Sequence, residues 1–319
     1  MKHKIAIHFC SGLLLTVFLH SGAAGQTKNL EAIATLKFFP AAQGNSFPVG
    51  NGPNSVAFDG ASVWVVNGLD QTVTKLRASD GSKLGTFRVG AAAGALAFDG
   101  ANIWIANTGA NTVTKLRASD GVKLGSFSFP AGLKSGTGIV FDGANIWVSN
   151  QGINAVSKLR ATDGVDQGTF ATGHQPQGVA FDGVHIWVAN TLDNTVTRIR
   201  ATDGTNQGTF PTGSAPRSLV FDGASIWVVN QIGNSVTKLR ASDGLNQGTF
   251  PVGGNPLAAV FDGSNIWVTN SFDSTVTRLR VTDGANLGTF PTGQAPSGVA
   301  FDGANVWTAN QSDGTVSKL

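Results

Sequence analysis

The sequence contains few of the side chains on which most enzymes rely. Its 319 residues include no tyrosine, one methionine, one cysteine and five histidines. Cys10 lies in an apolar segment near the N-terminus, so no disulfide and no cysteine metal site is expected in the rest of the chain. The one glutamate, Glu31, precedes the repeated part of the sequence. General acid–base and metal catalysis need several convergent titratable groups, and this composition argues against both.

The first residues have the pattern of a secretory signal peptide. A short basic start precedes an apolar stretch from Ile5 to Leu19, and small residues follow it. Polar residues interrupt this stretch, which is shorter than the roughly 20 residues of a membrane-spanning helix. We therefore expect a signal peptide over 1–25, a linker over 26–42, and a secreted or periplasmic protein without a membrane span.

A motif of the form FDGxxxWxxN occurs seven times and dominates the remaining sequence. It contains every tryptophan of the chain, and successive tryptophans are 40 or 43 residues apart. Self-similarity at such a period is typical of propellers and solenoids. The seven residues are Trp64, Trp104, Trp147, Trp187, Trp227, Trp267 and Trp307.

Each repeat divides into four short strand-like segments. In the repeat that begins at Gly178 they are GVAFD, HIWVAN, TVTRIR and QGTFP, here named strands A, B, C and D. Asp-Gly, Asn and Gly-Pro separate them, which indicates strands and turns rather than helices. The dipeptide Asp182-Gly183 predicts a tight hairpin turn with positive φ at both central positions. Seven such repeats predict an all-β fold over 43–319, a seven-bladed β-propeller with four antiparallel strands in each blade.

The repeated aromatic residues favour one explanation. The tryptophan of strand B and the phenylalanines of strands A and D recur at fixed offsets. Packed between neighbouring blades, each would bury roughly 150–250 Å². Stacking of the tryptophan on a sugar is the alternative that we consider less favoured.

The two ends of the repeated region complement each other. The last repeat ends with its C strand at Leu319, without a D strand, whereas GNSFPVG at 44–50 matches the D pattern GTFPTG. We therefore predict that this N-terminal segment forms the outer strand of the last blade. Such pairing would close the ring.

The excess of basic residues is small and periodic. The chain has 22 basic and 19 acidic residues and a pI near 9.1. Thirteen basic residues follow the pattern K/R-x-R of strand C, and thirteen aspartates recur in the FDG motif or in the (S/T)DG turn that follows strand C. We expect these charges to be solvated or paired at blade edges. A nucleic-acid surface would need an asymmetric basic patch, so we do not expect nucleic acid as a partner.

The repeats resemble the YVTN family of β-propeller proteins. The strings WVTN at 267–270, WVAN and WVSN, the NTV(T/S)(K/R) run and the link G-x-x-P-x-G-V-A carry the resemblance, with Trp in place of Tyr. Members of that family are secreted, periplasmic or on the cell surface, and mostly bind partners. FDGxxIW also resembles the repeats of streptogramin lyases and related NHL propellers. That resemblance implies metal-supported acid–base chemistry by histidine and glutamate, and the repeats contain only His174, His185 and no glutamate.

The variation between repeats identifies one face of the propeller as a candidate binding surface. The A–B and C–D turns lie on one face and barely differ, whereas the B–C turns and D–A links lie on the other and diverge. Variable loops are where repeat proteins bind. Drifting loops without a role are the alternative. The candidate residues are Lys134, His174, Gln175, Gln177 and Arg217 in D–A links, and the apolar residues Leu69, Ile153, Leu192, Ile232 and Phe272 in B–C turns.

Two periodic polar positions on this face are expected to be structural. Four aspartates sit six residues after their tryptophan, and an asparagine ends every B strand. A hard cation could bind such oxygens, but side-chain capping of the turns is favoured. The aspartates are Asp70, Asp193, Asp273 and Asp313, and the asparagines are Asn67, Asn107, Asn150, Asn190, Asn230, Asn270 and Asn310.

Together these features predict a secreted, monomeric β-propeller that acts as a binding or interaction scaffold. It would have no catalytic residues, no metal and no cofactor, and an unidentified protein or small molecule would bind on the variable face. A streptogramin-lyase-like metal-dependent enzyme is the alternative. In that case His174 is the candidate base on the variable face, and His185 is expected on the opposite face.

Overall fold

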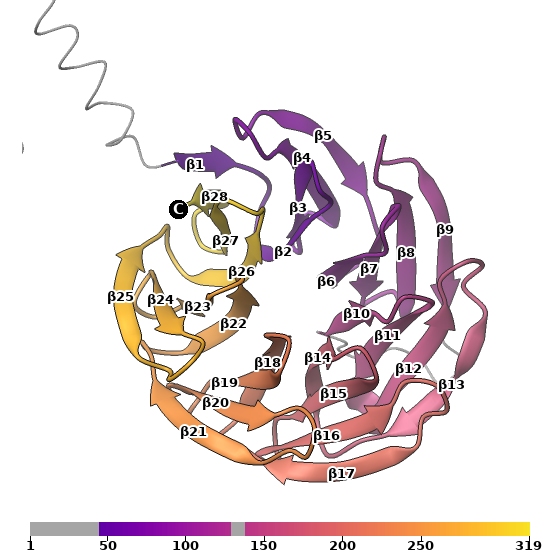
Figure 1. Cartoon of the computed structure of the whole chain (residues 1–319). Coiled ribbons are helices and arrows are strands. Elements are labelled where there is room, and N and C mark those ends of the chain that lie inside the picture. The colour runs from indigo at the N-terminus through magenta and orange to yellow at the C-terminus, as the bar shows by residue number, and fades with distance from the viewer. Residues whose placement is uncertain (1–44, 129–137) are drawn as a thin grey trace, which may run out of the picture. The chain divides into compact units, whose positions relative to one another are not determined.

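The computed structural model describes residues 45–128 and 138–319. Within residues 45–319, which form one compact unit, the strands make seven four-stranded antiparallel sheets arranged in a ring (Figure 1). Each sheet is one blade, in which strand A lies nearest the centre and strand D lies on the outside. The predicted β-propeller of seven blades is confirmed.

The inner A and B strands have five or six residues each, except β10, which has three. The A strands are β2 (Pro53–Phe58), β6 (Ala93–Phe98), β10 (Ile139–Phe141), β14 (Pro176–Phe181), β18 (Pro216–Phe221), β22 (Pro256–Phe261) and β26 (Pro296–Phe301). The B strands are β3 (Ser62–Asn67), β7 (Asn102–Asn107), β11 (Asn145–Asn150), β15 (His185–Asn190), β19 (Ser225–Asn230), β23 (Asn265–Asn270) and β27 (Val306–Asn310). A short 3-10 helix, η1 (Gln151–Ile153), follows β11.

The outer strands complete the blades. The C strands are β4 (Thr72–Arg77), β8 (Thr112–Arg117), β12 (Ala155–Arg160), β16 (Thr195–Arg200), β20 (Ser235–Arg240), β24 (Thr275–Arg280) and β28 (Thr315–Lys318). The D strands of blades one to six are β5 (Lys83–Arg88), β9 (Lys123–Ser128), β13 (Asp166–Ala171), β17 (Asn206–Pro211), β21 (Asn246–Pro251) and β25 (Asn286–Pro291).

The N-terminal strand β1 (Asn45–Pro48) is the D strand of blade seven. It pairs antiparallel with β28, with Phe47 opposite Val316. The Phe47 ring lies 5.5 Å from the Trp307 ring, as the D-strand phenylalanine does in the other blades. First and last repeats are thus joined in one sheet, as predicted, and the exposed edge of β28 is covered.

The hydrophobic core lies between the blades. Six of the seven tryptophans have no exposed surface, and Trp267 is partly exposed. The Trp147 ring lies 5.3 Å from the Phe170 ring and packs against Ile186 and Val188 of the next blade. Burial of such rings is the main stabilising contribution at each blade interface. The predicted inter-blade role of the tryptophans is confirmed.

The Asp-Gly turns differ from the prediction in their geometry. Asp182 is not among the residues with positive φ, and only Gly183 adopts it, at 98°. Four residues, 182–185, lie between Phe181 and Ile186, the last pair of the ladder between β14 and β15. Asp182 Oδ1 accepts hydrogen bonds from the backbone N–H groups of the two residues after Gly183. The aspartate therefore stabilises the turn through its side chain rather than by left-handed backbone geometry.

The same aspartate also holds the tryptophan. Asp182 Oδ2 accepts a hydrogen bond of 2.7 Å from Trp187 Nε1, and the equivalent bond occurs in all seven blades. Burial raises the pKa of the Asp182 carboxyl, but the hydrogen bonds from Trp187 and from the turn outweigh it, so that the pKa lies below its ordinary value. The motif FDGxxxW is thus a hydrogen-bonded unit of turn and core.

The prediction of solvated charges is wrong for the first basic residue of each K/R-x-R pattern. Lys158 is buried, its Nζ donates to the Ala201 carbonyl of the next blade at 2.8 Å, and it lies 4.9 Å from the Trp147 ring. In six of the seven blades this residue connects neighbouring blades, because its long side chain reaches the backbone carbonyls at the end of the next C strand. A cation–π contact adds to that hydrogen bond.

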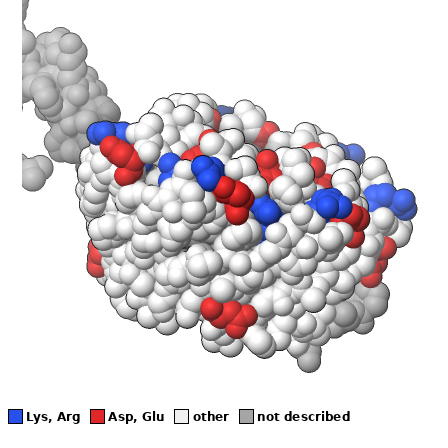
Figure 2. Space-filling model, turned by 60° about the horizontal axis from the view of Figure 1, so that its bottom comes forward, with Lys and Arg blue, Asp and Glu red and all other residues white. Residues whose placement is uncertain are grey.

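The second basic residue is paired, as expected. Arg160 donates to Asp163 Oδ2 at 2.6 Å, and five further blades repeat this exposed pair. Exposed pairs contribute little each. On the face shown in Figure 2, basic and acidic side chains lie next to each other, separated by uncharged surface. Among the described residues, no helix is long and apolar enough to cross a membrane.

Candidate functional site

The variable face carries the apolar side chains that the sequence predicts there. Leu69, Ile153, Leu192, Ile232 and Phe272 are exposed in the B–C turns, by between 40% and 81%. Together they form the apolar rim of this face. The candidate Lys134 lies outside the described residues.

The four aspartates of these turns are used within the protein. Asp70 Oδ2 accepts from the backbone N–H of Asn51 at 2.7 Å and Oδ1 accepts from its amide. Asp193, Asp273 and Asp313 make the same backbone contact, 19 residues back in the chain. The hydrogen bonds from Asn51 lower the pKa of the Asp70 carboxyl. These carboxylates cap the D–A links, as predicted.

The asparagine at the end of strand B connects three segments of the same blade. Asn67 Oδ1 accepts from the backbone N–H of Gly50, while its Nδ2 donates to the hydroxyls of Thr72 and Thr74. Equivalent bonds recur at Asn190 and Asn270. The predicted structural role of this position is therefore observed. It ties the D–A link to the B–C turn, so the variable face rests on a rigid base.

The two histidines of the repeats lie on opposite faces. His174 is exposed in the link before β14, and its Nδ1 lies 2.8 Å from Asp193 Oδ1. His185 begins β15 on the other face, with Nδ1 3.1 Å from Asp182 Oδ2. The backbone N–H of His174 lowers the pKa of the Asp193 carboxyl, which keeps that group ionised. His174 thus has an orienting carboxylate, as a general base would. Gln175 is beside it and has positive φ, 55°.

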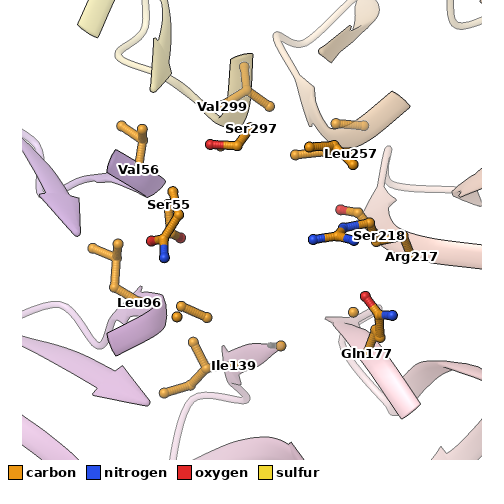
Figure 3. Close-up of a pocket in the computed structure, with 18 of the residues that line it drawn as sticks. Ser55, Val56, Leu96, Ile139, Gln177, Arg217, Ser218, Leu257, Ser297 and Val299 are labelled. Carbon is orange, nitrogen blue, oxygen red and sulfur yellow. The ribbon is translucent and has the colours of Figure 1, made fainter. Parts of the chain in front are cut away.

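The A strands line a central channel with a cavity of about 400 Å³ (Figure 3). The residues of each strand fall into three layers by their position. The layer nearest the variable face differs from blade to blade and contains Asn54, Gly94, Gln177, Arg217, Leu257 and Ser297. The layer furthest from it is apolar and contains Val56, Leu96, Ile139, Val179, Ala259 and Val299.

The middle layer consists of small residues, because the inner strands approach one another closely. A Cβ atom on Gly178 would lie 2.5 Å from the Arg217 carbonyl oxygen, and one on Gly138 would lie 2.2 Å from that of Gln177. The blades therefore meet backbone to backbone at this level. The layer above it can vary without disturbing that contact.

Among the described residues that line the cavity, Arg217 is the one with a charged side chain. Its side chain points into the channel in Figure 3, and one guanidinium N–H donates to Gln231 Oε1 at 3.1 Å. None of the ion pairs among the described residues includes Arg217. Burial lowers the pKa of the guanidinium, although an arginine remains protonated at any ordinary pH.

Two amide oxygens beside the channel have no partner. Gln177 is 8% exposed, and its Oε1 accepts no hydrogen bond within the described part of the chain. Asn54 donates from Nδ2 to the Ala93 carbonyl at 3.0 Å, but its Oδ1 is also unpartnered there. Buried polar groups normally have partners. The channel mouth therefore offers one cation and two free acceptors.

The structure brings together some of the predicted residues and separates others. Gln177 and Arg217 lie in adjacent blades at the channel mouth, whereas His174 lies on the exposed link outside it. The sequence analysis missed Asn54 and Leu257 at the equivalent positions. The signal was present, because the residue at this position differs in every repeat, from Asn54 to Ser297, while the residue after it is always Ser, Ala or Gly.

Comparisons with known proteins give structural likeness only. No family model matches the chain, and a comparison with curated protein sequences gave no match. A streptogramin B lyase superposes with a TM-score of 0.73 at 22% identity, covering 86% of this chain and 95% of the lyase. A virginiamycin B lyase from Staphylococcus aureus gives 0.73 at 20% identity, covering 86% and 97%. A hydrazine synthase of Kuenenia stuttgartiensis gives 0.75 at 19% identity, covering 84% and 95%.

These likenesses confirm the propeller fold and its similarity to streptogramin-lyase-like propellers. Identities of this size show the fold and no activity, and the fold is shared by lyases and by a hydrazine synthase. Function must therefore be argued from the residues of the variable face and the channel.

Proposed function

We propose that this protein is a secreted, non-catalytic β-propeller that binds a partner on the face formed by its B–C turns and D–A links. The observation that carries the proposal is the apolar rim. Large side chains are exposed in the B–C turns of five blades, and four of them lie at the same position of the repeat. These four are 68% to 81% exposed, more than apolar residues of the opposite face such as Val122 (46%) and Leu245 (55%). Exposed apolar surface around a polar centre is typical of a recognition site.

The geometry supports recognition in a second way. Capping by the aspartates and asparagines holds the backbone of these loops, so a partner would meet a preformed surface. Binding to a rigid surface costs little ordering of the loops. The side chains that differ between blades then determine which partner is accepted.

A lyase-like enzyme is the second candidate, favoured by the structural neighbours and by the His174–Asp193 pair. The side chains of the described residues do not form the metal centre that such a lyase would need. Within residues 45–128 and 138–319 no group of three or more His, Cys, Asp or Glu side chains could hold a metal ion. Asp193 is already used by the backbone of His174. Catalysis at this position would therefore depend on the His174–Asp193 pair alone.

The two candidates can be separated by experiment. Purified protein would be immobilised and incubated with the extracytoplasmic fraction of its source. A variant with Leu69, Leu192, Ile232 and Phe272 changed to Ser should lose the retained partner. A control variant with Val122 and Leu245 changed to Ser, exposed residues of the opposite face, should keep it. Equal retention by both variants would contradict the proposal.

The second candidate function, a lyase-like enzyme, is tested separately. The protein would be incubated with a cyclic depsipeptide and Mg²⁺, and ring opening would be followed by mass spectrometry. We expect no turnover. Turnover that disappears in His174→Ala and persists in His185→Ala would replace the binding proposal with the lyase reading.

A further inference from the structure

We infer that the mouth of the central channel binds a carboxylate group through Arg217, with Gln177 accepting a hydrogen bond from the same ligand. The inference rests on the proposed binding function, because it names the chemistry that one part of the variable face recognises. The ligand class is an organic acid that carries an N–H or O–H donor close to its carboxylate and an apolar substituent.

The first argument is the charge of Arg217. Most basic residues of the C strands are compensated, either by an aspartate or by the carbonyls of the next blade, as at Arg160 and Lys158. The basic residues of the D strands, Lys83, Arg88 and Lys123, are exposed to solvent. Arg217 instead shares one hydrogen bond with the neutral amide of Gln231 and faces the cavity. A guanidinium has five N–H donors. A half-buried cation without a counter-charge is costly, and an anion in the channel would compensate it.

The second argument is independent of charge. Gln177 belongs to the blade next to that of Arg217, is more than nine-tenths buried, and has an oxygen without a partner. Figure 3 shows both side chains directed toward the cavity. The Gln177 oxygen and the Arg217 guanidinium therefore match a ligand that has a hydrogen-bond donor next to its anionic group. A simple inorganic anion would leave Gln177 unsatisfied.

The charge balance favours a carboxylate over a phosphate. One guanidinium neutralises a single negative charge, whereas a phosphate monoester carries about −1.5 to −2 near neutral pH. The remaining charge would face neutral amides and, below them, the layer of Val56, Leu96 and Ile139. The planar guanidinium also matches the two oxygens of a carboxylate.

The remaining lining sets the shape of the ligand. Leu257 flanks Arg217 from the blade on the side away from Gln177 (Figure 3). A cavity of about 400 Å³ falls within the roughly 300–1,000 Å³ of small-molecule sites. An aliphatic substituent of a few carbons can therefore rest on Leu257 and the apolar layer while the carboxylate stays at the mouth.

The test uses N-acetyl-L-leucine and N-acetyl-L-leucinamide, which differ only in the carboxylate. Each would be titrated into the full-length wild-type protein while the Arg217 Nε–H signal is followed by ¹⁵N NMR. We expect a saturable shift with the acid, and at least about tenfold weaker binding of the amide, the usual size of a charge-assisted hydrogen bond. Equal titration by both compounds, or none by either, overturns the proposal. The two affinities are compared on the wild-type protein alone, and the variant described next serves to assign the signal.

Variants then locate the site. Arg217→Gln should weaken binding of the acid at least about tenfold and should identify the Nε–H signal by its loss. Gln177→Leu should weaken binding less, because the hydrogen bond that it removes joins two neutral groups. The matched control is Arg77→Gln, which removes the same charge from an exposed pair on the opposite face and should leave the affinity unchanged. A similar loss with Arg77→Gln would show a non-specific charge effect and refute the site.

Two further arms identify the source of the carboxylate and separate this inference from the proposed function. The acetylated tripeptide Gly-Gly-Leu, with a free or amidated C-terminus, tests a peptide end against a free acid, and tighter binding of the free tripeptide assigns a peptide. Inorganic phosphate should bind more weakly than N-acetyl-L-leucine, and the reverse order overturns the choice of carboxylate. Loss of a partner in the rim variant, together with no binding of either acid, would leave the proposed function standing and remove only this inference.

Discussion

Replacement of Trp147 tests the account of the blade interface most directly. Its side chain has no exposed surface, packs against Phe170, Ile186 and Val188, and donates to Asp142 at 2.7 Å. Trp147→Ala removes the packing, which costs about 3–5 kcal/mol in a core. It also removes the shorter of two hydrogen bonds to Asp142 Oδ2, the other being donated by Asn145 Nδ2 at 3.1 Å, and this loss adds about 1–3 kcal/mol. We therefore expect a loss of at least about 4 kcal/mol in the free energy of unfolding.

Trp147→Phe separates these contributions. A phenyl ring keeps most of the contact with Phe170 but lacks the N–H that Asp142 accepts. We expect a smaller loss of about 1–3 kcal/mol from the missing hydrogen bond to the carboxylate, in addition to the effect of the smaller ring. The measurement is guanidinium unfolding followed by far-UV circular dichroism, with the m-value compared between variants.

The matched control is Leu192→Ser on the variable face. Leu192 is 68% exposed, so its replacement should cost less than about 1 kcal/mol. If Trp147→Ala costs no more than Leu192→Ser, the tryptophan is not part of an inter-blade core and the reasoning fails. A Trp147→Phe variant as unstable as Trp147→Ala would refute the separation into packing and hydrogen bonding.

Three further outcomes follow from the same structure. Deleting residues 45–50 removes β1 from blade seven and should lower the melting temperature, whereas deleting 26–42 should not; equal melting temperatures would contradict ring closure. Lys158→Met should destabilise the protein more than Arg160→Met, because only Lys158 binds the next blade; the reverse order in denaturant unfolding would count against this. The pKa values of aspartates such as Asp182 are lower in the folded protein than the unfolded value of 3.8, so the unfolded chain binds more protons near that pH. The free energy of unfolding should therefore be constant above about pH 5 and fall as the pH drops below about 4. A denaturation midpoint that does not fall in that range would refute this prediction.

The fold could be predicted because one unit repeats at a nearly constant period. Strand boundaries follow from the Asp-Gly, Asn and Gly-Pro separators, and the predicted segments agree with β14 to β17 within one or two residues. The role of β1 followed from a missing D strand at the other end of the chain. Both inferences depend on comparing repeats with one another, which a sequence without repeats would not permit.

The contacts between blades could not be predicted in the same way. Lys158 looks like an exposed residue of a K/R-x-R pattern, and its burial depends on carbonyls 43 residues later that the ring places beside it. The Asp-Gly dipeptides likewise resemble two-residue hairpin turns, and the structure uses the aspartate side chain instead. Periodicity shows that the same residue type occurs in every blade, whereas its contacts become visible only when neighbouring blades are placed side by side.

The candidate site was predicted in part for a related reason. Variation between repeats located the face and included Gln177 and Arg217, but it did not show which variable residues share a channel. Seven inner strands converge on one axis, so residues 40 positions apart become neighbours and a set such as Asn54, Gln177 and Leu257 lines one cavity. Unpartnered oxygens and an uncompensated cation are properties of the assembled ring.

The channel mouth also shows how a repeated fold can hold an asymmetric site. At one of the variable positions Ser297 joins blades, since its hydroxyl contacts the carbonyls of Pro53 and Ala309. Arg217 at the equivalent position makes no bond to another blade's backbone and faces the cavity. The small residues beneath this layer maintain the contact between strands, so its members can differ without loss of the core. The inferred ligand therefore meets a cation and an acceptor on one side of the ring only, which fixes its orientation although the scaffold itself is nearly sevenfold symmetric.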